Sequence, residues 1–176
     1  MVSLSLVTVI TAVLFLNKSK VKKFQYASYL LIFGCSLTGL HWIYNSLYVI
    51  GGLPFLLSVL STGMLAFYVA AFYIVALILS RIYTFSSLEI AALITGLELL
   101  RSLLFSGFPW LEIGVLGVNL PLAKLAPFLG SYGVTFFIVL CVATLVNNFN
   151  FRSAFKVLSL FLISFFVGLI NLTGET

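Results

Sequence analysis

An acid and a base, Glu98 and Arg101, lie three residues apart inside an otherwise apolar run. The run continues through Gly-Phe-Pro to Trp110, and a second acid, Glu112, follows two residues later. Residues spaced i, i+3 share a helix face, and pairing lowers the cost of about 2.5–3.5 kcal/mol that each charge carries at mid-bilayer. We therefore expect either an ion pair that fixes this helix to its neighbours or a polar patch facing a lipid headgroup or a substrate.

Aromatic residues provide further candidates, namely Trp110 and, in a second segment, Trp42 and Tyr44. Tryptophan at a membrane–water boundary is commonly an anchor. Glu112, however, brings a charge into the same apolar loop as Trp110, which is unusual for a simple anchor. The neighbouring His41 has no partner acid close to it in the sequence and is interpreted as an interfacial histidine.

No complete catalytic set of residues can be recognised, so we assign no catalytic residue. Cys35 and Cys141 lie in apolar runs, without the spacing of a metal site, and apolar burial makes a thiol a poor nucleophile. We expect no metal and no cofactor. The net charge of +5 does not indicate nucleic-acid binding, because four of the nine basic residues crowd into residues 18–23.

Composition indicates a membrane protein, since 62% of the 176 residues are hydrophobic and only 7% are charged. Ordinary globular domains are roughly 45–50% apolar and about 25% charged. Membrane spans satisfy their own backbone hydrogen bonds as helices. We predict an all-α, polytopic membrane helix bundle that forms a single transmembrane domain over residues 1–176. Its spans, about six, are expected at residues 1–16, 26–48, 55–80, 87–105, 128–147 and 157–172.

The distribution of basic residues predicts the orientation, because short cytoplasmic loops are rich in lysine and arginine. The connectors at residues 18–23, at Arg81 and at residues 152–156 are expected to be cytoplasmic. Residues 41–54, residues 106–127 and the C-terminus are then extracytoplasmic. Prolines and glycines prevent residues 106–127 from forming one continuous helix. We expect both outer segments to be interfacial or re-entrant and to line a shared cavity.

Three ordered motifs carry a family resemblance. The first, Glu98-Leu-Leu-Arg-Ser-Leu-Leu-Phe-Ser-Gly-Phe-Pro-Trp-Leu, is followed by Pro121-Leu-Ala-Lys-Leu-Ala-Pro-Phe-Leu-Gly and preceded by Trp42-Ile-Tyr and Gly51-Gly-Leu-Pro. From about Lys23 to about Asn171 the chain resembles the membrane domain of bacterial apolipoprotein N-acyltransferases. The family pattern is E-x-L-R-x-x-x-x-T-G-F-P-W-L, and here Ser106 replaces the usual threonine.

The resemblance implies a reaction and a cellular location. The family transfers an acyl chain from a phospholipid donor to the N-terminal amine of diacylglyceryl lipoproteins in the bacterial inner membrane. Its Glu-Lys-Cys triad belongs to a nitrilase-like extracytoplasmic domain, expected to begin where this sequence ends at Thr176. None of the triad can be assigned here, and Trp110 alone carries over from the residues near the family's active site. We expect a truncated chain that is inactive alone, with a separately encoded nitrilase-like domain as a further partner.

Two other interpretations remain open from the sequence. One is a small multi-spanning transporter or channel subunit, whose pathway would consist of Glu98, Arg101 and His41. Transport proteins normally contain more such groups, and acids without adjacent bases. The other is a non-functional remnant of a disrupted gene, which is compatible with the family resemblance.

Overall fold

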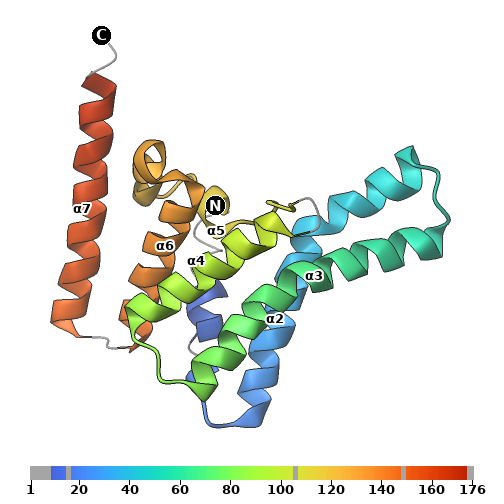
Figure 1. Ribbon diagram of the computed structural model, residues 1–176, viewed down its shortest axis with the longest axis horizontal. Coiled ribbons are helices and arrows are strands. Elements are labelled where there is room, and N and C mark those ends of the chain that lie inside the picture. The colour runs from blue at the N-terminus through green and yellow to red at the C-terminus, as the bar shows by residue number, and fades with distance from the viewer. Residues whose placement is uncertain (1–8, 15–16, 105–106, 148–149, 174–176) are drawn as a thin grey trace.

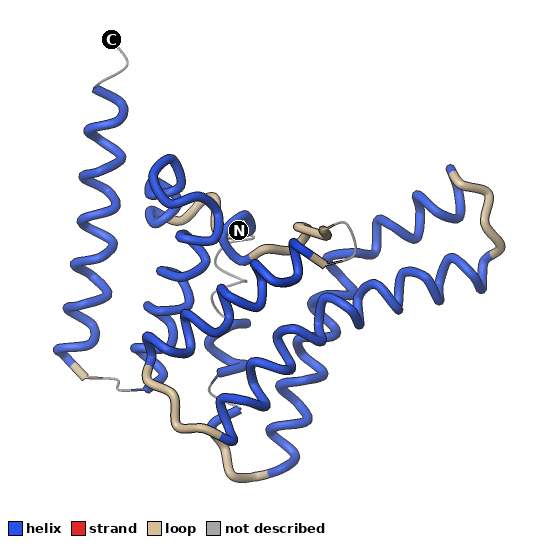
Figure 2. Tube along the Cα trace, viewed as in Figure 1, coloured by secondary structure: helices blue, strands red, loops and turns tan. Residues whose placement is uncertain are grey.

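The structure of the protein, a computed structural model, describes residues 9–14, 17–104, 107–147 and 150–173 (Figure 1). Within these ranges every regular element is a helix, and no strand is present (Figure 2). The predicted all-α fold is therefore confirmed for the described part of the chain.

The helices follow one another through short connections, and residues 9–14 are also helical. The elements are α2 (Lys22–Asn45), the π-helical turn η1 (Ser46–Ile50), α3 (Phe55–Ile82), α4 (Ser87–Leu103), the short α5 (Ile113–Leu116), the 3-10 turn η2 (Pro121–Leu125), α6 (Ala126–Asn147) and α7 (Phe151–Thr173).

Two stretches, Phe55–Ile82 and Pro121–Asn147, are long and apolar enough to cross a membrane by length and composition. The described residues of the spans predicted between residues 26 and 172 lie on helices, except that α4 ends at Leu103, and α7 starts at Phe151 rather than near residue 157. The predicted first span, residues 1–16, lies outside the described residues except for residues 9–14. The number of six spans stays a prediction.

Local sequence explains where several helices begin and end. Ser86 caps α4: its hydroxyl accepts the Glu89 N–H at 3.3 Å, and the Glu89 carboxylate accepts the Ser86 N–H at 2.7 Å. This reciprocal arrangement satisfies donors that a helix start leaves unpaired. In the turn between η1 and α3, Gly52 has φ +64°, which glycine adopts without strain. The chain can therefore turn back between η1 and α3.

The helices pack as an α2–α3 hairpin beside an α4–α6 pair, and α7 packs on η2 and α6. Figure 1 shows the tip of the hairpin projecting from one side of the molecule and α7 standing at the opposite edge. The largest buried cluster joins α4, α5 and α6 through residues such as Ile94, Ile113 and Ile138. Large apolar side chains are exposed elsewhere, for example Leu30 and Met64, as expected when hydrocarbon is the solvent.

The two outer segments differ from each other. Residues 107–125 break into a loop, α5 and η2, so the predicted absence of one continuous helix there is confirmed. Residues 41–50 instead continue α2 into η1 without interruption. The chain leaves the helix only at Gly51, because residues 41–50 contain no glycine or proline.

Candidate functional site

Glu98 is the centre of a buried polar network, and only 1% of its surface is exposed. Its Oε1 accepts the hydroxyl of Tyr73 on α3 and the backbone N–H of Ile113 on α5, the latter at 3.0 Å. Its Oε2 accepts the hydroxyl of Thr135 on α6 at 2.8 Å. One carboxylate therefore connects α4 to three other helices.

Arg101, one turn further along α4, is completely buried but points elsewhere. Its Nη1 donates to the carbonyl of Trp110 at 2.9 Å, and its guanidinium lies 5.9 Å from the centre of the Tyr73 ring. Its Nε and Nη2 have no hydrogen-bond partner. The expected ion pair with Glu98 is absent from the described network, so that expectation was wrong. Neutral donors from three helices occupy the carboxylate, while the arginine holds the outer loop.

Glu112 is the second buried acid, at the residue before α5. Its two oxygens accept the hydroxyls of Ser131 at 2.9 Å and Tyr132 at 3.0 Å, both on α6. The Gly114 N–H donates to the Thr135 hydroxyl at 2.8 Å. These contacts fix the short α5 onto α6.

Two backbone features show how tightly the outer loop is held. A Cβ on Gly114 would lie 2.0 Å from the carbonyl oxygen of Ser131, so only glycine allows this approach. Leu111 has φ 63°, a left-handed conformation that costs roughly 1–2 kcal/mol for a residue with a side chain. Its carbonyl lies 3.2 Å from the Tyr73 hydroxyl, within reach of the network that keeps the loop in this conformation.

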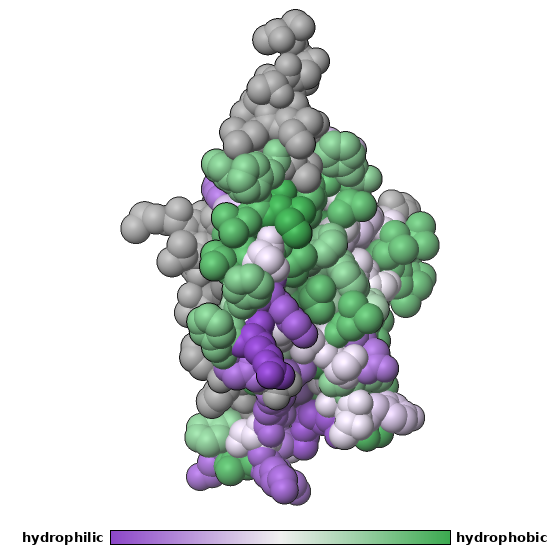
Figure 3. All heavy atoms as spheres, turned by 90° about the vertical axis from the view of Figure 1, so that its left-hand side faces the viewer, coloured by the Kyte–Doolittle hydropathy of each residue, from purple (hydrophilic) through white to green (hydrophobic). Residues whose placement is uncertain are grey.

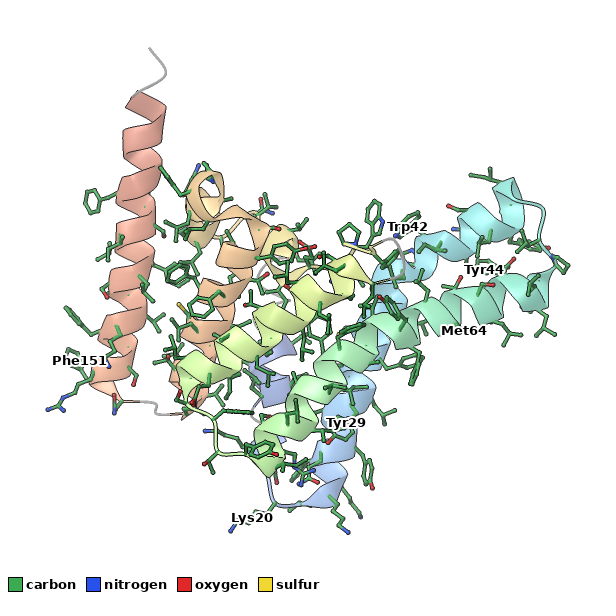
Figure 4. All side chains as sticks on the ribbon, in the orientation of Figure 1. Lys20, Tyr29, Trp42, Tyr44, Met64 and Phe151 are labelled. Carbon is green, nitrogen blue, oxygen red and sulfur yellow. The ribbon has the colours of Figure 1, made fainter. Side chains whose placement is uncertain are left out.

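Trp110 and Trp42 form an aromatic pair above the network. Their ring centres are 5.2 Å apart at an interplanar angle of 60°, and the side chains are 54% and 41% exposed. The pair brings the two outer segments into contact. Tyr44 lies further along the projecting hairpin (Figure 4), stacked on Tyr48 at 5.5 Å and in edge contact with Phe55. The structure thus brings together every sequence candidate except Tyr44.

An apolar cavity of about 120 Å³ lies beside the network. Tyr73, Leu111 and Ile113 belong to both, and Cys35 on α2 forms part of the wall. None of the described wall residues comes from residues 41–54. The second outer segment thus contributes to this cavity and the first does not, and a cavity shared by both stays a prediction.

Sequence analysis missed four members of the network: Tyr73, Ser131, Tyr132 and Thr135. Each is an uncharged polar residue in an otherwise apolar helix. Such residues also occur singly on lipid-facing surfaces, so their type carried little information. A clearer signal was available in the two acids, because a buried carboxylate needs several donors from neighbouring helices.

Comparison with known proteins places this chain in a family. The model of the "Apolipoprotein N-acyltransferase N-terminal domain" matches residues 1–145. The chain belongs to this family, and the resemblance deduced from the motifs is confirmed. The match also includes the residues before Lys23, which the motifs did not cover. With its apolar helices, the chain is a membrane protein of this acyltransferase family.

Three relatives described as apolipoprotein N-acyltransferases illustrate the similarity. The protein of Haemophilus ducreyi is 36% identical over 110 residues, which cover 62% of this chain and 22% of the relative. That of Coxiella burnetii is 32% identical over 146 residues, 77% of this chain and 30% of the relative. That of Photobacterium profundum is 34% identical over 145 residues, which cover 78% of this chain and 28% of the relative. The chain therefore spans about a quarter of the length of the relatives it matches.

Proposed function

We propose that this chain is the membrane part of an enzyme that transfers an acyl chain from a phospholipid to the N-terminal amine of diacylglyceryl lipoproteins. The observation that carries the proposal is the half-exposed Trp110–Trp42 pair on a loop that a buried network holds in place. A site that presents substrates to a reaction needs such rigid support, because small displacements reduce rates strongly.

The geometry suggests different roles for the site residues. Trp110 and Trp42 are accessible and offer aromatic faces and indole N–H groups to a lipid headgroup or to the lipoprotein. The adjoining cavity has apolar walls that suit hydrocarbon. Glu98, Arg101 and Glu112 are buried, so they act as positioning residues rather than substrate contacts.

The covalent chemistry requires residues outside this network. Among the described residues, no hydrogen bond connects Cys35 or Cys141 to an acid or a lysine. We propose that a nitrilase-like domain supplies the Glu-Lys-Cys triad, either on the same polypeptide or on a separate one. We further propose a multi-pass protein of about six spans in the bacterial inner membrane, with the outer loops and Thr176 extracytoplasmic.

A transport pathway is less consistent with the structure. His41 lies exposed on α2, where its Nδ1 is 2.6 Å from the carbonyl of Thr38. Glu98 and Arg101 are enclosed by packed helices instead. The three groups that such a pathway would use therefore do not lie along one cavity.

Exchange of the membrane domain tests the proposal. This chain is joined to the catalytic part of the Coxiella burnetii relative, and acyl transfer from phosphatidylethanolamine to a diacylglyceryl lipopeptide is measured in membranes. We expect transfer by the chimera and none by this chain alone. The parent enzyme serves as the active control. The proposed role would be contradicted if the chimera is present at a normal level but transfers no acyl chain. Turnover by this chain alone would contradict the need for a further domain.

A further inference from the structure

Two hollows with both polar and apolar walls open side by side at the end of the molecule opposite to the tryptophan pair. They have volumes of about 500 Å³ and about 680 Å³ and share Lys18, Phe85 and Asn147 in their walls. Figure 4 shows Lys20 at this end and Trp42 at the other. In Figure 3, hydrophilic residues gather toward this end of the visible face, below a broad hydrophobic area.

Basic side chains from three parts of the chain converge on these hollows. Lys18, Lys20 and Arg81 line the first, and Lys18 and Lys156 line the second. None of the described wall residues is an aspartate or a glutamate. The acid on the neighbouring first turn of α4, Glu89, caps that helix by accepting the Ser86 N–H. Cations gathered in this way repel one another, and an anion between them relieves that repulsion.

Hydrogen bonds fix the segment that carries Lys18 and Lys20 to α3 and α6. The Nδ2 of the buried Asn17 donates to the Leu77 carbonyl and to the Ser80 hydroxyl, both at 3.1 Å. The Lys18 ammonium donates to the Val146 carbonyl at 3.3 Å. Asn17 Oδ1, in contrast, is buried without a hydrogen-bond donor. The hollow thus offers both positive charge and one unpaired acceptor.

We propose that these hollows bind the headgroup of an anionic phospholipid of the phosphatidylglycerol type. The phosphate lies between Lys18, Lys20 and Arg81, and a glycerol hydroxyl provides the donor that Asn17 Oδ1 lacks. Basic pockets between membrane helices are suited to anionic headgroups. Apolar wall residues such as Leu88 and Leu160 leave the acyl chains in contact with the bundle. The site is separate from the outer loop and does not depend on the proposed acyl transfer.

Lipid titration of the purified full chain in a neutral detergent tests the site, with bound lipid counted by native mass spectrometry. Phosphatidylglycerol is expected to bind, and phosphatidylcholine is not. The double variant Lys18→Gln/Lys20→Gln should weaken phosphatidylglycerol binding by about tenfold or more, from the loss of two charges near the phosphate. Because Lys18 also supports the wall, Lys20→Gln/Arg81→Gln is measured as well; neither of these side chains forms a described hydrogen bond.

The matched control is Lys22→Gln/Lys23→Gln. It removes two charges from the same basic cluster, but neither residue lines a hollow. Its effect should stay below about twofold, because charges outside the site act only through the screened surface potential. Equal weakening by all three double variants would show general attraction to the membrane surface and overturn the site. Displacement of the lipid by inorganic phosphate alone would show a site for free phosphate and equally overturn the proposal.

Discussion

Glu98 on α4 and Thr135 on α6 form a 2.8 Å hydrogen bond inside the bundle, and the Thr135 oxygen also accepts the Gly114 N–H at 2.8 Å. One hydroxyl thus joins two long helices and the outer loop. In a membrane, lipid tails are as apolar as the surfaces of the helices. Burial of apolar side chains alone therefore drives little association between helices. Polar contacts of this kind therefore determine how α4, α5 and α6 fit together.

Replacement of Thr135 by valine tests this role. Thr135→Val keeps the shape of the side chain but leaves Glu98 Oε2 and the Gly114 N–H without this partner. Buried groups without partners cost about 1–3 kcal/mol each, so we expect a lower melting temperature of the purified chain. Thr95→Val is the matched control, because the Thr95 hydroxyl is buried without a partner. That change should leave stability equal or higher, and an equal loss in both variants would contradict a specific role of Thr135.

The contact between α5 and α6 gives a second prediction. In Gly114→Ala, the new methyl group would meet the Ser131 carbonyl at 2.0 Å, so α5 must move away from α6. Such overpacking typically costs about 1–3 kcal/mol, and we expect less folded protein in the membrane. Gly96→Ala on α4, where a Cβ meets nothing within 4 Å, should be neutral or slightly stabilising. Normal abundance of both variants would show that the loop tolerates displacement.

The sequence indicated the charged candidates for a physical reason. A charge in an apolar run is costly, so Glu98, Arg101 and Glu112 stood out, and all three are buried in the same region. The apolar runs also indicated where the helices lie, although the start of α7 at Phe151 was not predicted. The direction of the Arg101 side chain was not, since spacing on one helix says nothing about a loop that folds back from beyond it.

The conformation of the outer loop was also inaccessible to sequence reasoning. Leu111 adopts a left-handed conformation that glycine or asparagine would have signalled and leucine does not. The four-residue α5 is too short for a periodic pattern. Thr135 and Tyr73 became recognisable only after the fold had placed a carboxylate beside them.

Arg101 provides a third prediction, which the corrected geometry sharpens. Arg101→Leu removes the donor of the Trp110 carbonyl and leaves the buried Glu98 carboxylate without a nearby positive charge. We expect reduced protein in the membrane, measured by immunoblot against total expression. Arg101→Lys keeps the charge and should restore part of the level. If the leucine and lysine variants are equally abundant, the charge on residue 101 does not support the fold.

The proposed orientation is tested by cysteine labelling in intact cells. Cys35 and Cys141 are first replaced by serine, since Cys35 is exposed. A cysteine at Asn119, which is exposed beside η2, should then react with a membrane-impermeant maleimide from outside. A cysteine at Ser19 should react only after permeabilisation, because the lysine-rich connector is expected to be cytoplasmic. The reverse pattern would overturn the orientation and the extracytoplasmic position of Thr176.

Trp110→Phe separates a substrate contact from a membrane anchor. Phenylalanine still fills the interface, but it lacks the indole N–H and part of the aromatic face that meets Trp42. In the chimera with a complete catalytic domain, we expect acyl transfer to fall by about threefold to tenfold, the equivalent of one aromatic contact, at unchanged protein level. Tyr83→Phe changes a similarly exposed aromatic residue at the C-terminal end of α3 and should retain full transfer. If Trp110→Phe also retains it, the residue only anchors the loop, since anchoring requires no particular ring. If protein level falls together with activity, Trp110 supports folding instead. The fall in protein level of Arg101→Leu, which removes a hydrogen bond to the same loop, is the reference for such a folding defect.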